Sequence, residues 1–350
     1  MNLTTLNSST FKFGRHEFVN SNPEMAIPLL IALGLGTVIG TFGNVLILLG
    51  VARAKDLQNM ESVFIVNLAC SDLYVTALAD PMSITAKLEG EDFFERIPGL
   101  CRAIACMCTI SCVNSLMSIS ALSFNRFIYI CHNKYYKKIF TVRSCIFMCG
   151  VFYTIGIFLT MLNYLDIGDH TFDRKSLECI WDRMATYSYT VVFSIVLVWI
   201  PIVVIGLSYL KIFLRVKASR QRIHQSRLRT STSSSNFASS FQLCKTMFII
   251  YIVFATCWAP YALIIVVDHD DSFDYAPHLY IVVWAHMHPS LNWLVYYFTN
   301  MKFQRAFDSI LFITRCRRRV EVEDVVVTQT TENSLKPPKR VHSTKESAGM

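Results

Sequence analysis

Two ionisable side chains stand within long apolar stretches of the sequence. Asp72 lies in the stretch Asn67–Leu73, and Arg126 lies near the end of a stretch that carries no charge after Arg102. Burying an ionisable group in such surroundings is costly, so each is a candidate for function. Asp72 can bind a monovalent cation or form a hydrogen-bonded knot with polar groups. Arg126, where the apolar stretch meets water, is either a snorkelling anchor or a cytoplasmic switch.

Three polar residues of other apolar stretches are the expected partners of Asp72, namely Ser115, Asn292 and His288. We predict a sodium or proton site from these four residues. A protonated His288 would replace the sodium ion and make activity depend on pH, whereas a neutral His288 would only hydrogen-bond to Asp72. His286 and His288 diverge by about 200° on a regular helix, so they cannot bind one metal ion together. No metal site and no cofactor is predicted.

An aromatic pair and a proline suggest a second switch. Phe254 and Trp258 are four residues apart, so they stack on one face of a helix. Pro260 removes a backbone hydrogen bond and kinks that helix. An aromatic pair beside a kink can pack in two ways, which suits a conformational change.

Seven apolar segments must position these residues. Each is near or above the ~20 residues that a membrane-spanning helix needs. The chain is 53% hydrophobic and 17% charged, which is typical of a membrane protein. We predict an all-α membrane protein, a seven-transmembrane helix bundle. Its spans are 27–52, 63–86, 100–131, 144–165, 186–214, 243–267 and 276–299.

Charge sets the predicted orientation. The connections after the first, third, fifth and seventh segments are basic and the others are acidic. The positive-inside rule therefore places the N-terminus outside and the C-terminus inside. The net charge of +8 then reflects basic cytoplasmic loops and not binding of nucleic acid. The outer end carries two glycosylation sequons, at Asn2 and Asn7.

Composition divides the chain into three parts. Residues 1–26 form a polar extracellular tail with no apolar core, so the first span is expected to act as the insertion signal. The transmembrane domain covers 27–313 and ends in a short amphipathic helix. Residues 314–350 are expected to be a disordered cytoplasmic tail.

The three outer connections are rich in acid. They hold thirteen of the 25 Asp and Glu residues against five basic ones, Lys87, Arg96, Arg174, Lys175 and Arg183. The simplest interpretation is ordinary solvated loops. The alternative is electrostatic steering of a cationic ligand or a basic peptide.

These features together resemble the rhodopsin-like (class A) G protein-coupled receptors over residues 27–313. The motifs are Gly43-Asn44-Val45, Leu68–Asp72, Cys101 with Asn125-Arg126-Phe127, Pro201 and Tyr209, Cys257–Pro260, and Asn292–Tyr296. The resemblance implies a Cys101–Cys179 disulfide. It implies a G protein switch formed by Asn125, Arg126, Phe127, Tyr209, Asn292 and Tyr296. It also implies a relay core formed by Leu116, Pro201, Phe254 and Trp258.

Within this class the chain is most similar to the melatonin receptors, on the stretch Asn125–His132 and on Cys257–Pro260. The likeness places Asn163 and Trp181 at ligand-facing positions. The full ligand set is then Cys108, Cys112, Asn163, Trp181, Phe193, Trp258, Tyr261 and His286. This set describes an apolar, aromatic pocket for a small amphipathic molecule, although a peptide can also enter such a pocket.

Departures from the family pattern concern the switch. Asn125 is neutral and Ser240 stands where some relatives have an acid, so both halves of the usual inactive-state clamp are absent. We therefore expect measurable ligand-free signalling. Trp293 replaces the family's proline and Pro289 lies one turn earlier, so the kink of the seventh span should move toward the outside. Cys316, within a basic cluster, is either palmitoylated or a free thiol.

The predicted function is that of a plasma-membrane receptor, and not of an enzyme. It binds an extracellular ligand and activates a heterotrimeric G protein, with the inhibitory class suggested by the melatonin resemblance. Arrestin and membrane lipid are further expected partners. The alternatives are an atypical or orphan receptor that signals through arrestin or by pairing with another receptor, and a peptide-activated receptor.

Overall fold

The computed structural model describes residues 12–225 and 231–312, with the side chains of residues 219–243 outside the description. Residues 1–307 and 308–350 are two compact units, and the first contains the helix bundle. The predicted modifications at Asn2, Asn7 and Cys316 lie outside the described residues.

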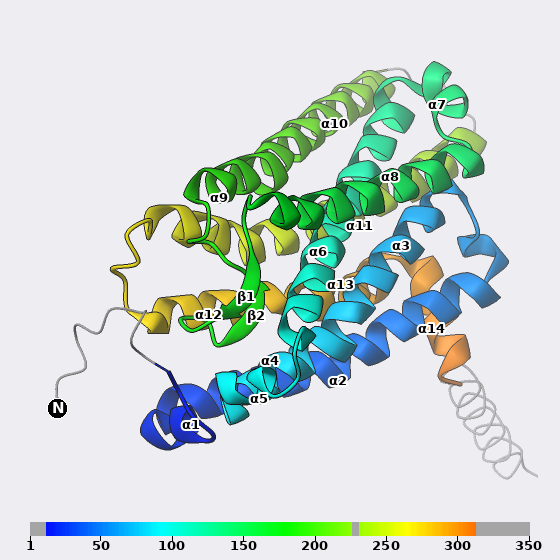
Figure 1. The fold of residues 1–350 in the computed structure, drawn as a ribbon. Helices are drawn as coiled ribbons and strands as arrows, with labels where there is room; N and C mark the ends of the chain where they lie inside the picture. The colour runs from blue at the N-terminus through cyan, green and yellow to red at the C-terminus, as the bar shows by residue number, and fades with distance from the viewer. Residues whose placement is uncertain (1–11, 226–230, 313–350) are drawn as a thin grey trace, which may run out of the picture. The chain divides into compact units, whose positions relative to one another are not determined.

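Helices dominate the described chain, as predicted (Figure 1). Six of them are long and apolar enough to cross a membrane. A spanning segment must satisfy its own backbone hydrogen bonds, and uninterrupted helices do so. The first four spans are α2 (Pro23–Arg53), the continuous run of α3 (Met60–Tyr74), η3 (Val75–Ala79) and α4 (Asp80–Glu89), then α6 (Leu100–Cys131), and α8 (Val142–Met161) with η4 (Leu162–Leu165). The fifth span, Tyr187–Ala218, lies in the run of α9 (Tyr187–Phe193), η5 (Ser194–Trp199) and α10 (Ile200–Gln225), and the sixth, Cys244–Val267, lies in α11 (Ser231–Val267).

The seventh span consists of two helices of 12 residues each, α12 (Tyr275–His286) and α13 (His288–Thr299). The interruption at Met287 comes just before Pro289, which stands in the first turn of α13. Proline is tolerated in a first turn because its missing N–H has no partner there in any helix. The break lies on the outer side of Trp293, as the sequence predicted, and Pro289 stands one turn before Trp293.

A hairpin follows α8, which the all-α prediction did not include. Strands β1 (His170–Asp173) and β2 (Glu178–Trp181) pair antiparallel, with Phe172 opposite Cys179. The Asp173 carboxylate accepts hydrogen bonds from the turn residues Lys175 and Ser176. The hairpin is tied to α6 through the Cys101–Cys179 disulfide, which the resemblance predicted.

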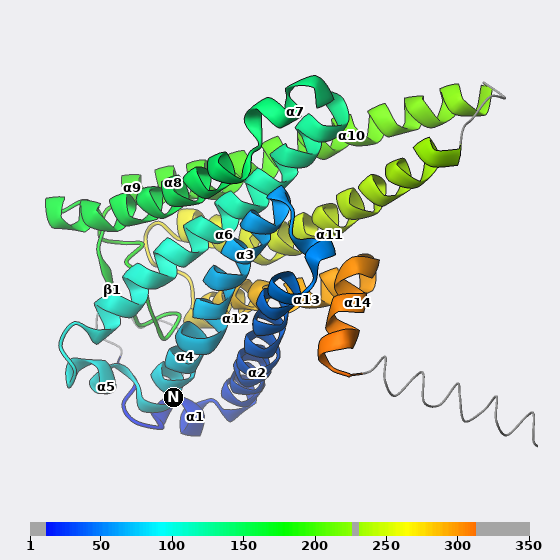
Figure 2. The ribbon, with the colours of Figure 1, turned by 90° about the vertical axis from the view of Figure 1, so that its right-hand side faces the viewer.

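Short helices lie at both ends of the bundle. They are α1 (Glu17–Ser21), η2 (Lys55–Leu57), α5 (Glu91–Glu95), α7 (Asn133–Ile139) and α14 (Met301–Ile310). Within α14, Phe303, Ala306 and Phe307 are buried, which confirms the predicted amphipathic helix. Figure 2 places α1, α5 and β1 at one end and α7 at the other. We name the end with the disulfide the outer end and the end with Arg126 the inner end, following the predicted orientation.

Candidate functional site

A small cavity lies beneath strand β2, between α6, α9, α11 and α12. Its lining contains every predicted ligand contact except Asn163, and it consists of Cys108, Thr109, Cys112, Ile180, Trp181, Phe193, Trp258, Tyr261, Val282, Ala285 and His286. The volume is about 30 Å³, which holds only a few water molecules. An organic ligand can therefore enter only if wall side chains move.

Four aromatic rings form one connected part of the cavity wall. The ring of Trp181 lies 3.9 Å from that of Phe193 and 6.1 Å from that of Tyr261, between centroids. Trp258 continues the cluster, 5.9 Å from Tyr261. Trp181 is positioned by the disulfide two residues before it, and its Nε1–H has no hydrogen-bond acceptor among the described residues. The cavity thus offers aromatic surface and one unused donor.

Asn163 lies outside the cavity lining. Its side chain contacts His170 of β1, and the other ring nitrogen of His170 lies 2.9 Å from the Thr109 hydroxyl. Because η4 tightens the chain after α8, Asn163 faces the hairpin. Burial holds the pKa of His170 down at about 4. Asn163 and a neutral His170 therefore anchor the hairpin to α6 and α8.

A buried ionic cluster stands behind His286. The His286 Nδ1 lies 2.8 Å from the Asp80 carboxylate, and its Nε2 lies 3.4 Å from that of Glu178. Lys87 pairs with Glu178 at 2.9 Å, and its side chain is fully buried. Burial disfavours the charged form of Glu178, but Lys87, His286 and the Ser83 hydroxyl together outweigh burial, so the pKa of Glu178 lies below its usual value.

Sequence reasoning missed most of this cluster, since Lys87 and Glu178 were assigned to solvated loops. A signal was present. Asp80, Ser83 and Lys87 are three and four residues apart, so they share one face of a helix. The Ser83 hydroxyl indeed donates to Glu178 at 2.5 Å.

The predicted residues around Asp72 come together deep in the bundle. Ser115 donates to the Asp72 carboxylate at 2.9 Å and Asn292 at 2.6 Å. The His288 Nε2 lies 3.7 Å from the same carboxylate. Trp258 donates from Nε1 to His288 Nδ1 at 3.2 Å. A doubly protonated imidazole has no acceptor nitrogen, so this contact favours neutral His288 over the protonated form.

Two of the predicted relay residues, Phe254 and Trp258, contact His288. The rings of Phe254 and Trp258 stack at 6.1 Å, and Phe254 also packs edge-on against His288 at 5.4 Å. Leu116 is buried on α6, and Pro201 follows the π-helical turns of η5. A path of contacts therefore joins the cavity wall at Trp258 to Asp72.

At the inner end, Arg126 forms an ion pair with Glu61, and both side chains are almost fully buried. The sequence predicted that both halves of the usual clamp are absent, and it did not predict this carboxylate from another helix. Asn125 supplies no charge, but Glu61 of α3, 65 positions before Arg126 in the sequence, supplies one. The side chain of Ser240 lies outside the description.

The other predicted switch residues occupy separate places. Phe127 packs against His132 at 5.4 Å, and the Tyr209 hydroxyl lies 3.3 Å from that of Ser123. Asn292 belongs to the Asp72 site described above. Tyr296 is buried against Phe303 of α14, at 4.6 Å between ring centroids. The structure thus spreads this set along the inner half of the bundle.

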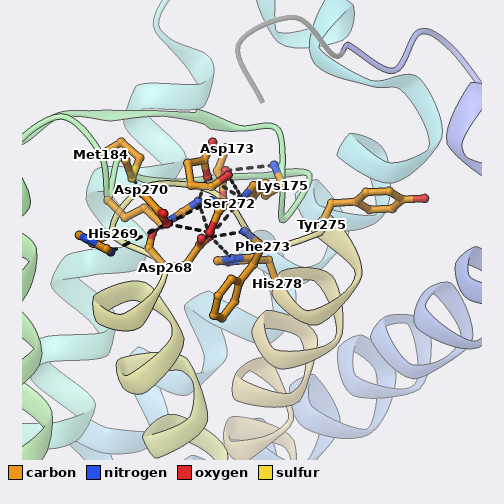
Figure 3. A network of polar contacts seen from close by, with 12 residues as sticks. Asp173, Lys175, Met184, Asp268, His269, Asp270, Ser272, Phe273, Tyr275 and His278 are labelled. Atoms are coloured by element: carbon orange, nitrogen blue, oxygen red, sulfur yellow. Dashed lines mark hydrogen bonds and ion pairs between the residues drawn. The ribbon is translucent and has the colours of Figure 1, made fainter. Parts of the chain in front are cut away.

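At the outer end, Asp268 is the centre of a second buried network (Figure 3). Its Oδ2 lies 3.0 Å from Lys175 Nζ, 2.8 Å from His278 Nε2 and 3.2 Å from an Arg183 guanidinium nitrogen. The same carboxylate also accepts the Phe273 backbone N–H at 2.9 Å. Burial alone would raise the pKa of Asp268, but these donors hold it below its usual value.

These contacts correct the expectation of ordinary solvated loops. Lys87, Lys175, Arg183, Glu178 and Asp268 are all buried in ion pairs. Other outer acids, such as Asp270, are exposed. The buried acids already have cationic partners, so they are not free to attract a cationic ligand.

Known proteins share this architecture. Residues 43–296 match the family model described as 7 transmembrane receptor (rhodopsin family). The Danio rerio melatonin receptor type 1B-B is 28% identical over 320 residues, covering 89% of each chain. The Homo sapiens melatonin receptor type 1B is 28% identical over 297 residues, covering 83% of this chain and 79% of the relative.

A solved structure agrees in fold. The crystal structure of squid rhodopsin superposes with a TM-score of 0.73 at 19% identity, covering 87% of this chain and 89% of that one. The chain therefore belongs to the rhodopsin family of seven-transmembrane receptors, which are G protein-coupled receptors and not enzymes, and within that family it is similar to the melatonin receptors.

Proposed function

We propose that the chain is a plasma-membrane receptor for a small, neutral, aromatic ligand and that it activates an inhibitory G protein. The cavity under β2 carries this proposal. Its wall is aromatic, and the carboxylates nearest to it, Asp80 and Glu178, are paired with His286 and Lys87. An ammonium ligand would have to break those pairs, whereas a neutral molecule leaves them intact.

Ligand binding can reach the inner end through Trp258. The cavity is too small for an organic molecule, so the ligand must shift wall residues. Trp258 is a wall residue whose indole also donates to His288. A ligand that favours the shifted position of Trp258 would change the population of the active arrangement by its difference in affinity for the two states.

Cyclic AMP after forskolin, in cells that express the chain, tests the function. Wild type, Arg126→Ala and Arg143→Ala are compared with and without melatonin at matched surface expression. Arg143 is an exposed inner-end arginine and serves as the matched control. We expect melatonin to lower cyclic AMP in wild type and Arg143→Ala but not in Arg126→Ala. No fall in wild type, with receptor at the surface, contradicts the proposed ligand and G protein class.

An atypical receptor is the second candidate function. The Asn125 side chain is neutral and Arg126 is occupied by Glu61, so the G protein contact is the altered part of the molecule. Arrestin recruitment or pairing with another receptor, without a change in cyclic AMP, would favour this candidate. Arrestin and membrane lipid remain proposed partners in either case.

A further inference from the structure

We propose that Glu61 is the residue that restrains Arg126 in the resting state, as a clamp supplied by the second span. Asn125 cannot provide that charge. Glu61 stands in the first turn of α3, which begins after the N-cap residue Asn59. The inference concerns regulation of the proposed G protein site and rests on that proposed function, but the clamp itself can be tested without a G protein.

Burial strengthens the Arg126–Glu61 ion pair and makes the loss of one partner costly. Arg126 is 3% exposed and Glu61 is 8% exposed, so water screens their attraction poorly. Removing one partner of a buried pair leaves the other charge uncompensated, which is far costlier than losing a surface pair. Among the described residues, Glu61 is the one carboxylate that pairs with Arg126. Without Glu61, the Arg126 guanidinium is a buried and unpaired charge, and moving toward water lowers its free energy.

A third element reaches the same pair. The Tyr136 hydroxyl of α7 lies 3.4 Å from Glu61 Oε1 and 3.4 Å from Asn125 Nδ2. The Arg126 guanidinium also lies 5.5 Å from the ring centre of Tyr129. Both contacts are weaker than the ion pair. The connection between α6 and α8 thus touches the clamp, so a protein that docks on α7 can loosen it.

A natural cysteine reports whether the clamp is open. Cys244 of α11 is 5% exposed and lies within electrostatic range of Arg126. If Arg126 and α11 separate, this thiol becomes accessible to a maleimide. Its alkylation rate can be followed by peptide mass spectrometry in purified receptor, relative to the total amount of the peptide that contains Cys244.

Four chains test the proposal: wild type, Glu61→Gln, Asp56→Asn and Glu61→Gln with Asn125→Asp. We expect Glu61→Gln to raise the Cys244 rate about three- to tenfold. Asp56 is an exposed acid of η2, so Asp56→Asn should match wild type. Asn125→Asp places a carboxylate beside Arg126 and should return the rate of the double variant to within about twofold of wild type.

A wild-type rate in folded Glu61→Gln, or an unchanged high rate in the double variant, overturns the proposal. If Glu61→Gln does not fold, recovery of folding by Asn125→Asp supports the clamp and failure to recover overturns it. Because alkylation requires no G protein, a positive result stands even if melatonin and Arg126→Ala leave cyclic AMP unchanged. That second outcome would reject only the proposed function.

Discussion

The two ends of the bundle hold their buried charges in different ways. At the outer end, the Asp268 carboxylate has three cationic or histidine partners and a backbone donor, and a separate cluster joins Glu178 to Lys87 and His286. At the inner end, Glu61 is the one carboxylate among the described residues that pairs with Arg126. A disulfide adds a covalent tie at the outer end. Among the described residues, the buried charges of the outer end are therefore paired redundantly, whereas the Arg126 charge is paired with one carboxylate.

The difference in the number of ion-pair partners suggests which end of the bundle is rigid and which end moves. A redundant network keeps most of its contacts when one is lost, so it favours a single arrangement. A pair that can be broken by one movement gives two arrangements of similar free energy, which a ligand or partner can bias. We infer that the outer end forms a fixed frame for the cavity and that the inner end is the part that changes.

The largest effect should come from the centre of the outer network. Among the described residues, Asp268→Asn leaves Asp271 as the one carboxylate that pairs with the buried cations Lys175 and Arg183. We expect a loss of about 3 kcal/mol in the free energy of unfolding, seen as a lower melting temperature in detergent. Asp270→Asn is the matched control, because Asp270 is exposed two residues away. Equal melting temperatures for the two variants would show that the outer network does not stabilise the frame.

Lys87→Met should have the next largest effect. It leaves Glu178 with Ser83 and His286 but without its ammonium partner, at a cost of about 2–3 kcal/mol. Adding Glu178→Gln removes the stranded charge, so the double variant should be less destabilised than the sum of the single variants. Additive losses in melting experiments would mean that the two residues are not coupled.

Acid should loosen the outer end through His170. Its folded pKa of about 4 lies below its usual value of 6.5, so folding favours the neutral ring. The contribution of His170 to the free energy of unfolding is then fully present above pH 6.5. It is lost as the pH falls toward 4, which lowers the free energy of unfolding by about 1–3 kcal/mol. His170→Gln should flatten the melting temperature across this range. His269→Gln, an exposed histidine, should retain the wild-type slope.

The smallest effect should come from the exposed pairs of the outer end. Lys12 contacts Asp92 and Glu95, whose side chains are 52% and 56% exposed. Water and salt screen such pairs. Lys12→Ala should therefore have the same melting temperature as wild type. A clearly lower melting temperature would show that exposed charges also stabilise the outer end.

Much of this architecture follows from local patterns in the sequence. Apolar length predicts the spans, because the membrane imposes a fixed thickness. Polar residues inside spans have few possible partners, so Asp72, Ser115 and Asn292 were expected together. Pro289 predicts the position of the break in the last span, since a proline fits the first turn of a new helix better than the interior of a continuous one.

What the sequence left unpredicted depends on contacts between distant elements. Glu61 meets Arg126 only because α3 and α6 pack in a particular register, which neither segment reveals alone. Lys87 and Glu178 are buried because the β1–β2 hairpin folds inward, so a loop charge became a core charge. Asn163 was placed by its likeness to melatonin receptors, but the local turn η4 directs it to His170.

The most direct test of the contrast between the two ends compares the alkylation rate of Cys244 in two variants, Glu61→Gln and Asp268→Asn. Both rates are measured at one temperature, below the melting temperature of either variant. We predict a faster rate in Glu61→Gln and the wild-type rate in Asp268→Asn, although Asp268→Asn is the less stable protein. Equal rates in the two variants would contradict the account, because the inner end would then respond to general loosening and not to loss of its own ion pair.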